Sequence, residues 1–335
     1  MVGGRHVKSR PTPLLAGSMK GHAAARPFRL TPNTWRNRWV ARAVILGAPL
    51  ERLNYRAFAL WARVVGRCAS DDAVAVVRLS SDTELEILLG DFYWNRLLSN
   101  GYRYEPEVEW LLHALGDVDY TLLDCGANFG YWSAQASSAT LGAHRVLAIE
   151  PLPSTYSRLE RNAALNGDRF IHRRLAVHRE SRQRMMIYER GSHAGASLLV
   201  AWLGNDRPLS QMHDVETICV DDLASGFSRR HADLIVKLDI EGLERLALEG
   251  ASSAIEGGAL FIYEDSGEDR ECLVSRFVLA DLGLSVFALA DVGGVVPMTD
   301  VRQIARLKTS RKRGYNLVAT KHGSAFWHRL SRLVK

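Results

Sequence analysis

The residues that could do chemistry gather at the ends of short apolar runs. Asp124 ends the run 121–123, and a turn of sequence GANFG follows it from Gly126 to Gly130. Glu150 ends the next run and lies 20 residues after Gly130. Short apolar runs beside a glycine turn are typical of buried parallel strands. The order of strand, glycine turn, helix, strand and acid predicts the first β-α-β unit of a nucleotide-type fold, which binds ligands at the carboxyl ends of its strands.

The turn favours S-adenosylmethionine over a dinucleotide. Dinucleotide-binding turns read G-x-G-x-x-G, whereas this turn reads G-x-x-x-G. Asp124 would repel a pyrophosphate but attract the ammonium and sulfonium groups of S-adenosylmethionine. Glu150 can accept hydrogen bonds from both ribose hydroxyls. Each acid also has a structural interpretation, because Asp124 could order the loop and Glu150 could cap a helix or form a surface ion pair.

A third apolar run, LIVKL, is interrupted by Lys237 and closed by Asp239. In a parallel sheet Asp239 would reach the same edge as the glycine turn. There it could orient an acceptor, deprotonate a hydroxyl or bind the ammonium of the cofactor. The alternative is an acid that caps the next helix. Because a lysine in a buried strand needs a partner, we expect Lys237 to reach Asp124 or Glu264.

These three segments resemble the signature of the FkbM family of S-adenosylmethionine-dependent methyltransferases. They read DCGANFGYWS from residue 124, AIEPLPSTYSRLERNAALN from 148 and VKLDIEGLERLALEGA from 236, and the resemblance covers roughly 104–264. It implies an α/β class I methyltransferase fold: an open Rossmann-like sheet, mostly parallel with an antiparallel last strand, and helices on both faces. It also implies a cytoplasmic enzyme that most often methylates a hydroxyl of a sugar, glycan or natural product.

Together, the motifs and the resemblance give a set of candidate cofactor-binding residues. Asp239 is the first candidate for a general base, and His193 is the second. His193 lies in a small-residue loop between expected hairpin strands at 185–188 and 196–200. The candidates for binding S-adenosyl-L-methionine are Asp124, Gly126, Asn128, Gly130, Tyr131, Glu150, Pro151, Ala176, Asp239 and Glu241.

Metal ligation is not expected, because the four cysteines are widely separated and show no metal-ligand spacing. Their use suits a reducing cytoplasm. The acids Asp239, Glu264 and Asp265 would be the ones to hold Mg²⁺ if a metal assisted. In the family, Tyr102 and Tyr104 would lie near the cofactor pocket, but we expect them to serve ordinary packing.

Positive charge is concentrated at the two ends of the chain. The net charge is +6, yet residues 1–50 hold nine Lys or Arg, residues 301–335 hold ten, and neither segment contains an acid. The basic ends could contact an anionic membrane surface, nucleic acid or an acidic glycan. Solvated tails are the simpler interpretation. No apolar stretch reaches the roughly 18 residues that a membrane span needs.

Two other functions compete with glycan or natural-product methylation. An RNA or DNA methyltransferase would use the basic ends, but the chain has LDIEG where amino-directed enzymes have [DN]-P-P-[YFW], and it lacks a Pro-Cys turn. We therefore expect no nucleic-acid partner. A cofactor-binding adaptor without catalysis is the second alternative, and the intact acids Asp124, Glu150 and Asp239 argue against it.

The sequence divides into four segments. We expect a disordered basic arm over 1–33 and an N-terminal helical or mixed extension over 34–103, with one or two helices over 34–67 broken near Gly47 and Pro49. The methyltransferase domain would follow over 104–322. Residues 323–335 would form a basic C-terminal tail.

Overall fold

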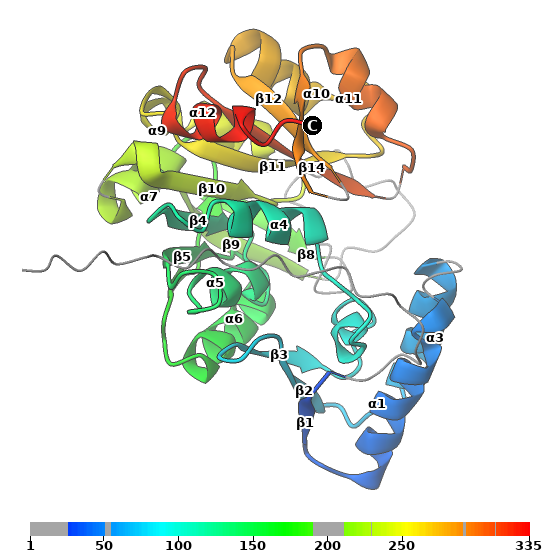
Figure 1. Cartoon of the computed structure of the whole chain (residues 1–335). Helices are drawn as coiled ribbons and strands as arrows, with labels where there is room; N and C mark the ends of the chain where they lie inside the picture. Colours follow the sequence, from blue (N-terminus) through cyan, green and yellow to red (C-terminus); the bar gives the residue numbers. More distant parts are fainter. Residues whose placement is uncertain (1–25, 51–54, 190–210, 229, 291–292, 312) are drawn as a thin grey trace, which may run out of the picture.

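The computed structural model describes residues 26–50, 55–189, 211–228, 230–290, 293–311 and 313–335. Within them, the centre is an eight-stranded sheet of order β13-β12-β14-β11-β10-β4-β5-β6 (Figure 1). The strands from β11 to β6 are parallel, and β14 is antiparallel to β11. The predicted sheet is therefore confirmed. Its strands are β4 (Thr121–Cys125), β5 (Arg145–Ile149), β6 (Ile171–Arg173), β10 (Leu234–Leu238), β11 (Leu260–Ser266), β12 (Ser285–Leu289), β13 (Val295–Met298) and β14 (Gly314–Thr320).

Both faces of this sheet are covered by helices, because its central strands are apolar on both sides. Successive residues of a strand point to opposite faces, and Leu122 and Leu123 of β4 accordingly belong to different core clusters. The first face packs against α4 (Pro106–Ala114), α5 (Tyr131–Ala136), α6 (Pro153–Leu165) and α12 (Ala325–Ser331). The second packs against α7 (Val220–Phe227), α8 (Glu244–Glu249), α9 (Ser252–Glu256), α10 (Leu273–Arg276), the π-helix η4 (Phe277–Asp281) and α11 (Val301–Leu307).

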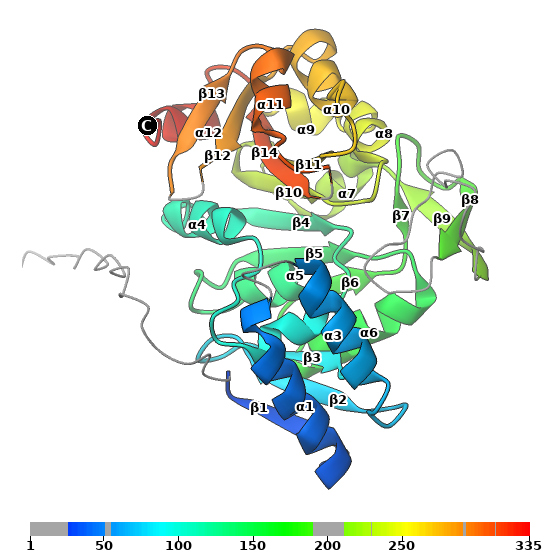
Figure 2. The ribbon, with the colours of Figure 1, turned by 90° about the vertical axis from the view of Figure 1, so that its right-hand side faces the viewer.

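The N-terminal extension is a small antiparallel sheet covered by two helices (Figure 2). It contains β1 (Phe28–Thr31), β2 (Val74–Arg78) and β3 (Glu84–Leu88), together with α1 (Trp35–Gly47), α3 (Tyr55–Gly66) and the 3-10 helix η1 (Trp94–Leu98). One or two helices over 34–67 were expected, and the described residues of this range form two, α1 and α3. The boundary of the basic arm was wrong, because residues 28–31 pair with β2.

Asn162 of α6 and Asn166 at the C-terminal end of that helix join this extension to the domain of the eight-stranded sheet. The Asn162 side chain accepts from the N–H of Glu86 (2.6 Å) and donates to its carbonyl oxygen (3.2 Å). Asn166 makes the same two bonds with the backbone of Glu84 (3.1 and 2.7 Å). The two amides thus satisfy the free edge of β3 as a neighbouring strand would. Because Asn162 also donates to the carbonyl of Phe129 (2.8 Å), the extension is held against the glycine turn.

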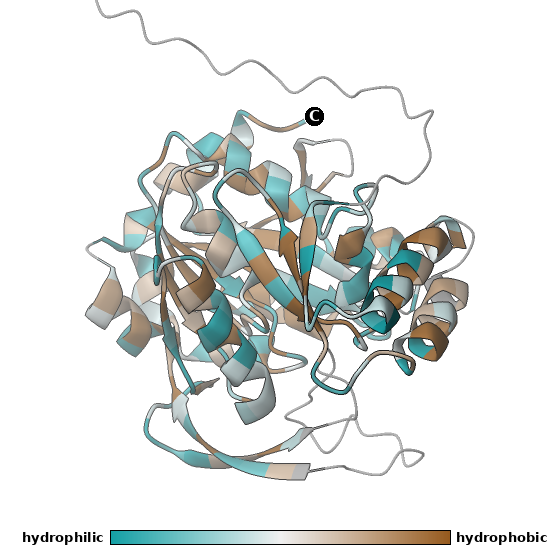
Figure 3. Cartoon of the chain, turned by 90° about the horizontal axis from the view of Figure 1, so that it is seen from below, coloured by the Kyte–Doolittle hydropathy of each residue, from teal (hydrophilic) through white to brown (hydrophobic). Residues whose placement is uncertain are grey.

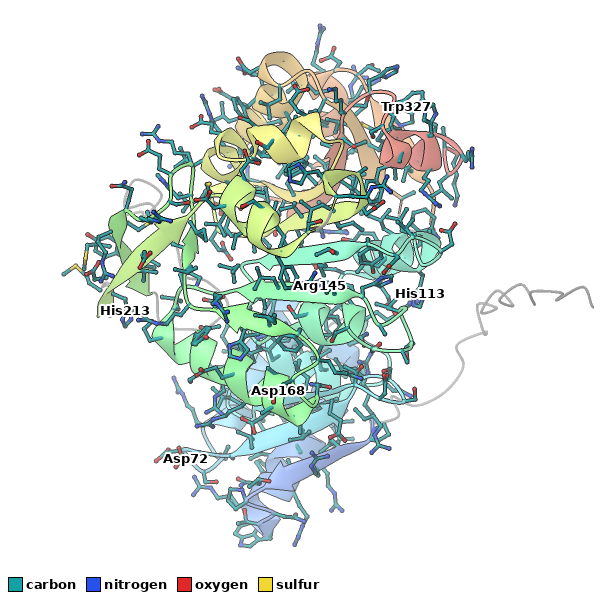
Figure 4. All side chains as sticks on the ribbon, turned by 90° about the vertical axis from the view of Figure 1, so that its left-hand side faces the viewer. Asp72, His113, Arg145, Asp168, His213 and Trp327 are labelled. Carbon is teal, nitrogen blue, oxygen red and sulfur yellow. The ribbon has the colours of Figure 1, made fainter. Side chains whose placement is uncertain are left out.

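The C-terminal segment is part of the fold. Residues predicted as a tail form α12, whose Phe326 and Leu330 are buried and whose Arg329 pairs with Asp117 at 2.8 Å. This helix lies beside the sheet, where Trp327 marks it in Figure 4.

A third, three-stranded sheet consists of β7 (Ala176–Val177), β8 (Arg184–Glu189) and β9 (Gln211–Ile218). Figure 4 shows β9, marked by His213, on the opposite side of the molecule from the end of α4, marked by His113. The predicted hairpin strand 196–200 lies outside the described residues. Among those described, no helix has the length and apolar character needed to cross a membrane.

Candidate active site

A cavity of about 950 Å³ opens at the carboxyl ends of β4, β5 and β10. Among the described residues, seven carboxylates and four cationic side chains line it, so its wall is predominantly acidic. All three sequence motifs reach this cavity, as the topology of a parallel sheet requires. The predicted site residues that line it are Asp124, Gly126, Asn128, Tyr131, Glu150, Pro151, Asp239 and Glu241.

The glycine turn does not offer its backbone to a ligand. Each N–H group from 126 to 130 already donates to an acceptor within the protein, so the turn has no donor left for a phosphate. This agrees with the expected preference for a cofactor without phosphate. The bonds run from Gly126 and Ala127 to the carbonyl of Ile149 (both 2.9 Å), from Asn128 to Glu150 Oε2 (3.0 Å), from Phe129 to Asn128 Oδ1 (2.9 Å) and from Gly130 to the carbonyl of Ala127 (2.8 Å).

The two glycines of the turn are needed for close packing. Gly126 has φ +81°, and a Cβ placed there would lie 1.8 Å from the carbonyl oxygen of Asp239. Gly130 has φ +85°, and its Cβ would lie 2.7 Å from Cδ1 of Leu159 in α6. Gly126 therefore lets the turn press against the end of β10, where Asp239 begins its loop. Gly130 does not line the cavity and instead seats the turn on α6.

Glu150 is held by the backbone at the cavity wall. Its carboxylate accepts from the N–H groups of Asn128 and Leu152, both at 3.0 Å. Burial raises the pKa of Glu150 to about 7, although these two bonds favour the ionised form. A surface ion pair does not account for Glu150, because the residue is only 5% exposed. Helix capping alone does not account for it either, because its two bonds join the glycine turn to the start of α6.

Asp124 is buried beneath the turn. Its Oδ2 accepts a hydrogen bond of 2.6 Å from the hydroxyl of Ser133 in α5, and only 1% of the residue is exposed. Burial raises the pKa of Asp124 above its ordinary value. The side chain thus has a fixed orientation at the floor of the cavity.

Lys237 supplies positive charge in the midst of these acids. Its Nζ lies 2.9 Å from Asp239 Oδ2 and 3.8 Å from Glu105 Oε2. Burial alone would lower the pKa of Lys237, but the carboxylates of Asp239, Glu105 and Asp124 raise it above its ordinary value. The expected ion pair with Asp124 or Glu264 was wrong, because the side chain reaches Asp239 and Glu105 instead.

Glu105 is a site residue that the sequence arguments missed. It precedes α4 at φ 41°, accepts from Trp132 Nε1 at 2.6 Å and also accepts from Asn316 at 3.2 Å. Burial raises the pKa of Glu105. The only local signal was an acid before Pro106, which reads equally well as the start of a helix. Its approach to Asp239 depends on tertiary packing.

The carboxylates of Glu105, Asp239 and Glu264 are close enough to hold a cation. One carboxylate oxygen from each residue lies within 4.8 Å of those from the other two. Lys237 already places an ammonium beside two of them, so a metal would have to share this position with it. Asp265 points elsewhere and forms a buried ion pair with Lys308 at 2.6 Å, so it does not join this group.

A second wall of the cavity is aromatic. Trp94 of η1 stacks on Tyr131, with ring centroids 6.2 Å apart, and donates from Nε1 to Asn128 Oδ1 at 3.2 Å. Tyr104 meets Tyr131 edge to face at 4.9 Å. Tyr102 and Tyr104 both line the cavity, so the expectation that they serve only ordinary packing was wrong. The clustered aromatics at 93–94 and 102–104 were the signal available in the sequence.

Ala176 and His193 complete the predicted set. Ala176 does not line the cavity: it is fully buried against Leu152 and Ile187. Its neighbours Leu175 and Val177 line the cavity in its place, because alternate strand residues point to opposite sides. His193 lies outside the described residues.

Comparison with known proteins gives one family match. Residues 124–270 match the family model described as the methyltransferase FkbM domain. None of the curated proteins matches the chain.

Solved structures show weak overall similarity to the chain. One is the methyltransferase FkbM from Methylobacillus flagellatus KT, with 16% identity, a TM-score of 0.37, and coverage of 85% of this chain and 58% of that one. The chain therefore spans less than two thirds of that protein. Another is the O-methyltransferase from Bacillus cereus in complex with SAH, with 12% identity, a TM-score of 0.36, and coverage of 66% and 84%.

A putative O-methyltransferase from Klebsiella pneumoniae is similar at 13% identity, with a TM-score of 0.36 and coverage of 66% of this chain and 83% of that one. These scores carry no argument about substrate, so the assignment depends on the family match and the fold. Residues 124–270 therefore match the methyltransferase FkbM domain, and this match covers less than half of the chain.

Proposed function

We propose that the protein transfers a methyl group from S-adenosylmethionine to a hydroxyl of a sugar, glycan or natural-product acceptor. The observation that carries this proposal is the acidic cavity beside a glycine turn whose N–H groups are all bonded within the protein. Such a site disfavours a pyrophosphate and favours a ligand that carries ammonium and sulfonium charges.

Each part of the cofactor has a matching group in the wall. Asp124 and Asp239 would attract the ammonium, and Glu150 would accept hydrogen bonds from the ribose hydroxyls. Apolar side chains of Leu152, Leu175 and Val177 offer a surface for the adenine ring. Bound there, S-adenosylmethionine would supply an electrophilic methyl group. The cavity is at the upper end of the range of about 300–1,000 Å³ for ligand sites, which leaves room for an acceptor beside the cofactor.

The chain's own residues have to position the acceptor hydroxyl and remove its proton. Asp239 is the proposed base, because it lines the cavity, its backbone contacts the glycine turn and its carboxylate lies close to those of Glu105 and Glu264. Its bond to Lys237 fixes its orientation and balances its charge. Positioning of this kind contributes about 7–11 kcal/mol in well-oriented reactions, and general-base assistance typically adds about 10²–10⁴-fold. His193 remains the second candidate for the base.

The combination of aromatic faces and carboxylates suits a sugar-like acceptor. Trp94, Tyr102 and Tyr104 offer flat apolar surfaces, while Glu241 and Glu264 can bond to hydroxyl groups. Glu241 is exposed at this wall, so its carboxylate is accessible to an acceptor hydroxyl.

The test is transfer of labelled methyl from S-adenosylmethionine to panels of glycans, small hydroxylated natural products and RNA. We expect label in the hydroxylated acceptors, with a rate about 100-fold lower for Asp239→Asn and unchanged for the matched surface variant Asp300→Asn. Label in RNA alone would favour the nucleic-acid alternative. Cofactor binding without transfer to any acceptor would favour the adaptor.

A further inference from the structure

We propose that the helices α1 and α3 dock the protein onto an anionic lipid surface. The first observation is that α1 is apolar on two opposite faces. Its inner face buries Val40, Ala41 and Val44. Its outer face carries Trp35, Trp39 and Leu46, which are 75%, 51% and 78% exposed.

The exposed residues of α1 form one stripe. Positions 35, 39, 42 and 46 follow the spacing i, i+4, i+7 and i+11, which places their side chains on one side of an α-helix. Arg42 lies within this stripe between Trp39 and Leu46. Because the opposite side already packs on the extension, the stripe is not needed to hold the helix in place.

Helix α3 repeats this arrangement. Phe58, Ala62 and Val65 are buried, whereas Leu60 and Val64, four residues apart on the other side, are 65% and 53% exposed. The two helices lie side by side at the outer edge of the molecule, away from the eight-stranded sheet (Figures 1 and 3). Together they carry six of the thirteen exposed large apolar side chains among the described residues, and such a concentration marks an interaction surface.

The charges on this pair have one sign. Neither helix contains Asp or Glu, and the exposed arginines of α1 are bonded only to neutral groups or to none of the described residues. Arg36 donates to the carbonyls of Cys68 and Ala69, and Arg38 donates to Asn33. In the described part of the chain no carboxylate forms an ion pair with either helix, so their charge is available to an anionic partner.

This combination fits a lipid surface better than a protein partner. Tryptophan favours the membrane–water interface, where its ring is apolar and its N–H remains hydrated. Arginine can extend its charged end to phosphate groups while its stem lies along apolar surface. Membrane-surface helices combine these residue types, and their binding increases with both apolar area and anionic lipid content. Residues 1–50, with nine Lys or Arg and no acid, add charge of the same sign.

The test is sedimentation of the full chain with lipid vesicles. We expect binding to phosphatidylcholine vesicles that contain about 30% phosphatidylglycerol, little binding to phosphatidylcholine alone, and weakening as salt is added. Trp35→Ala with Trp39→Ala should reduce binding by about tenfold or more. Arg38→Gln with Arg42→Gln should reduce it by about fivefold for each charge removed.

Matched variants separate docking from unrelated surface effects. Leu273→Ala removes an exposed apolar side chain elsewhere, and Arg302→Gln removes an exposed arginine. Both should sediment like the wild type, and all variants should keep an unchanged circular dichroism spectrum and melting temperature. Equal sedimentation of the Trp35→Ala/Trp39→Ala variant and the wild type would overturn the proposal. Dimerisation that this variant abolishes, without vesicle binding, would show instead that a second copy covers the face.

Discussion

Replacing Gly126 by alanine tests how the glycine turn positions Asp239. A Cβ at this position would lie 1.8 Å from the carbonyl oxygen of Asp239, whereas ordinary contacts begin at 3.4 Å. The turn and the end of β10 would therefore have to separate by about 1.6 Å. A displacement of about 1 Å in a reacting group can lower the rate about 100-fold. We expect at least that loss of methyl transfer in Gly126→Ala.

Gly167→Ala is the matched control. Gly167 has φ +68°, also in the left-handed region, but a Cβ there meets no atom within 4 Å. This variant should lose about 1 kcal/mol of unfolding free energy in urea, since alanine disfavours this conformation by roughly 1–2 kcal/mol and restricts the unfolded chain. Gly126→Ala should lose more stability and also weaken binding of S-adenosylmethionine in calorimetric titration. Equal stability losses with normal activity in both variants would refute the proposed role of the close contact.

Three further predictions follow from the buried charges. Lys308→Met should lower the free energy of unfolding in urea by about 3–5 kcal/mol, because it leaves Asp265 buried without its partner. The double variant Lys308→Met/Asp265→Asn should recover part of this loss. An absence of recovery would contradict the pairing. Burial raises the pKa of Glu150 and Glu244 to about 7 in the folded state. The free energy of unfolding should therefore fall as pH rises from about 4.5 to 7, by up to about 3 kcal/mol per group. A free energy of unfolding in urea that stays constant across this pH range would contradict the argument. Affinity for S-adenosylmethionine should rise between pH 6 and 8 as Glu150 ionises, and Glu150→Gln should weaken binding about tenfold and flatten this dependence; a profile unchanged by the substitution would count against Glu150 as a ligand.

The sheet and the meeting of its three motifs could be predicted from the sequence. Asp124, Glu150 and Asp239 each end an apolar run, and the carboxyl ends of parallel strands share one edge. That geometry depends only on local pattern and on the handedness of the connections. The structure accordingly brings all three side chains to one cavity.

Contacts made by the N-terminal extension could not be predicted in this way. Trp94 and Glu105 reach the cavity because Asn162 and Asn166 hold the extension on α6. Side-chain amides that bond to the edge of a sheet produce no periodic pattern in the sequence, so this contact could not be predicted. Ala176 was wrongly predicted to line the cavity, where its neighbours lie instead. A strand of two residues has no alternating pattern that would show which side chain faces the cavity.

Too little secondary structure was predicted at the two ends of the chain, because the many basic residues there surround short apolar patterns. Residues 28–31 alternate between exposed and half-buried, but four residues amid arginines give a weak strand signal. Phe326 and Leu330 are spaced i, i+4 and were the available sign that α12 packs on the domain.

The most direct test of the central claim is calorimetric titration of the purified protein with S-adenosylmethionine and, separately, with NADH. The account predicts micromolar binding of S-adenosylmethionine, strong loss of that binding in Asp124→Asn, and no binding of NADH. Three results would contradict the assignment of the acidic cavity to a cofactor that lacks phosphate. They are binding of NADH, absence of heat on titration with S-adenosylmethionine, and unchanged S-adenosylmethionine binding in Asp124→Asn.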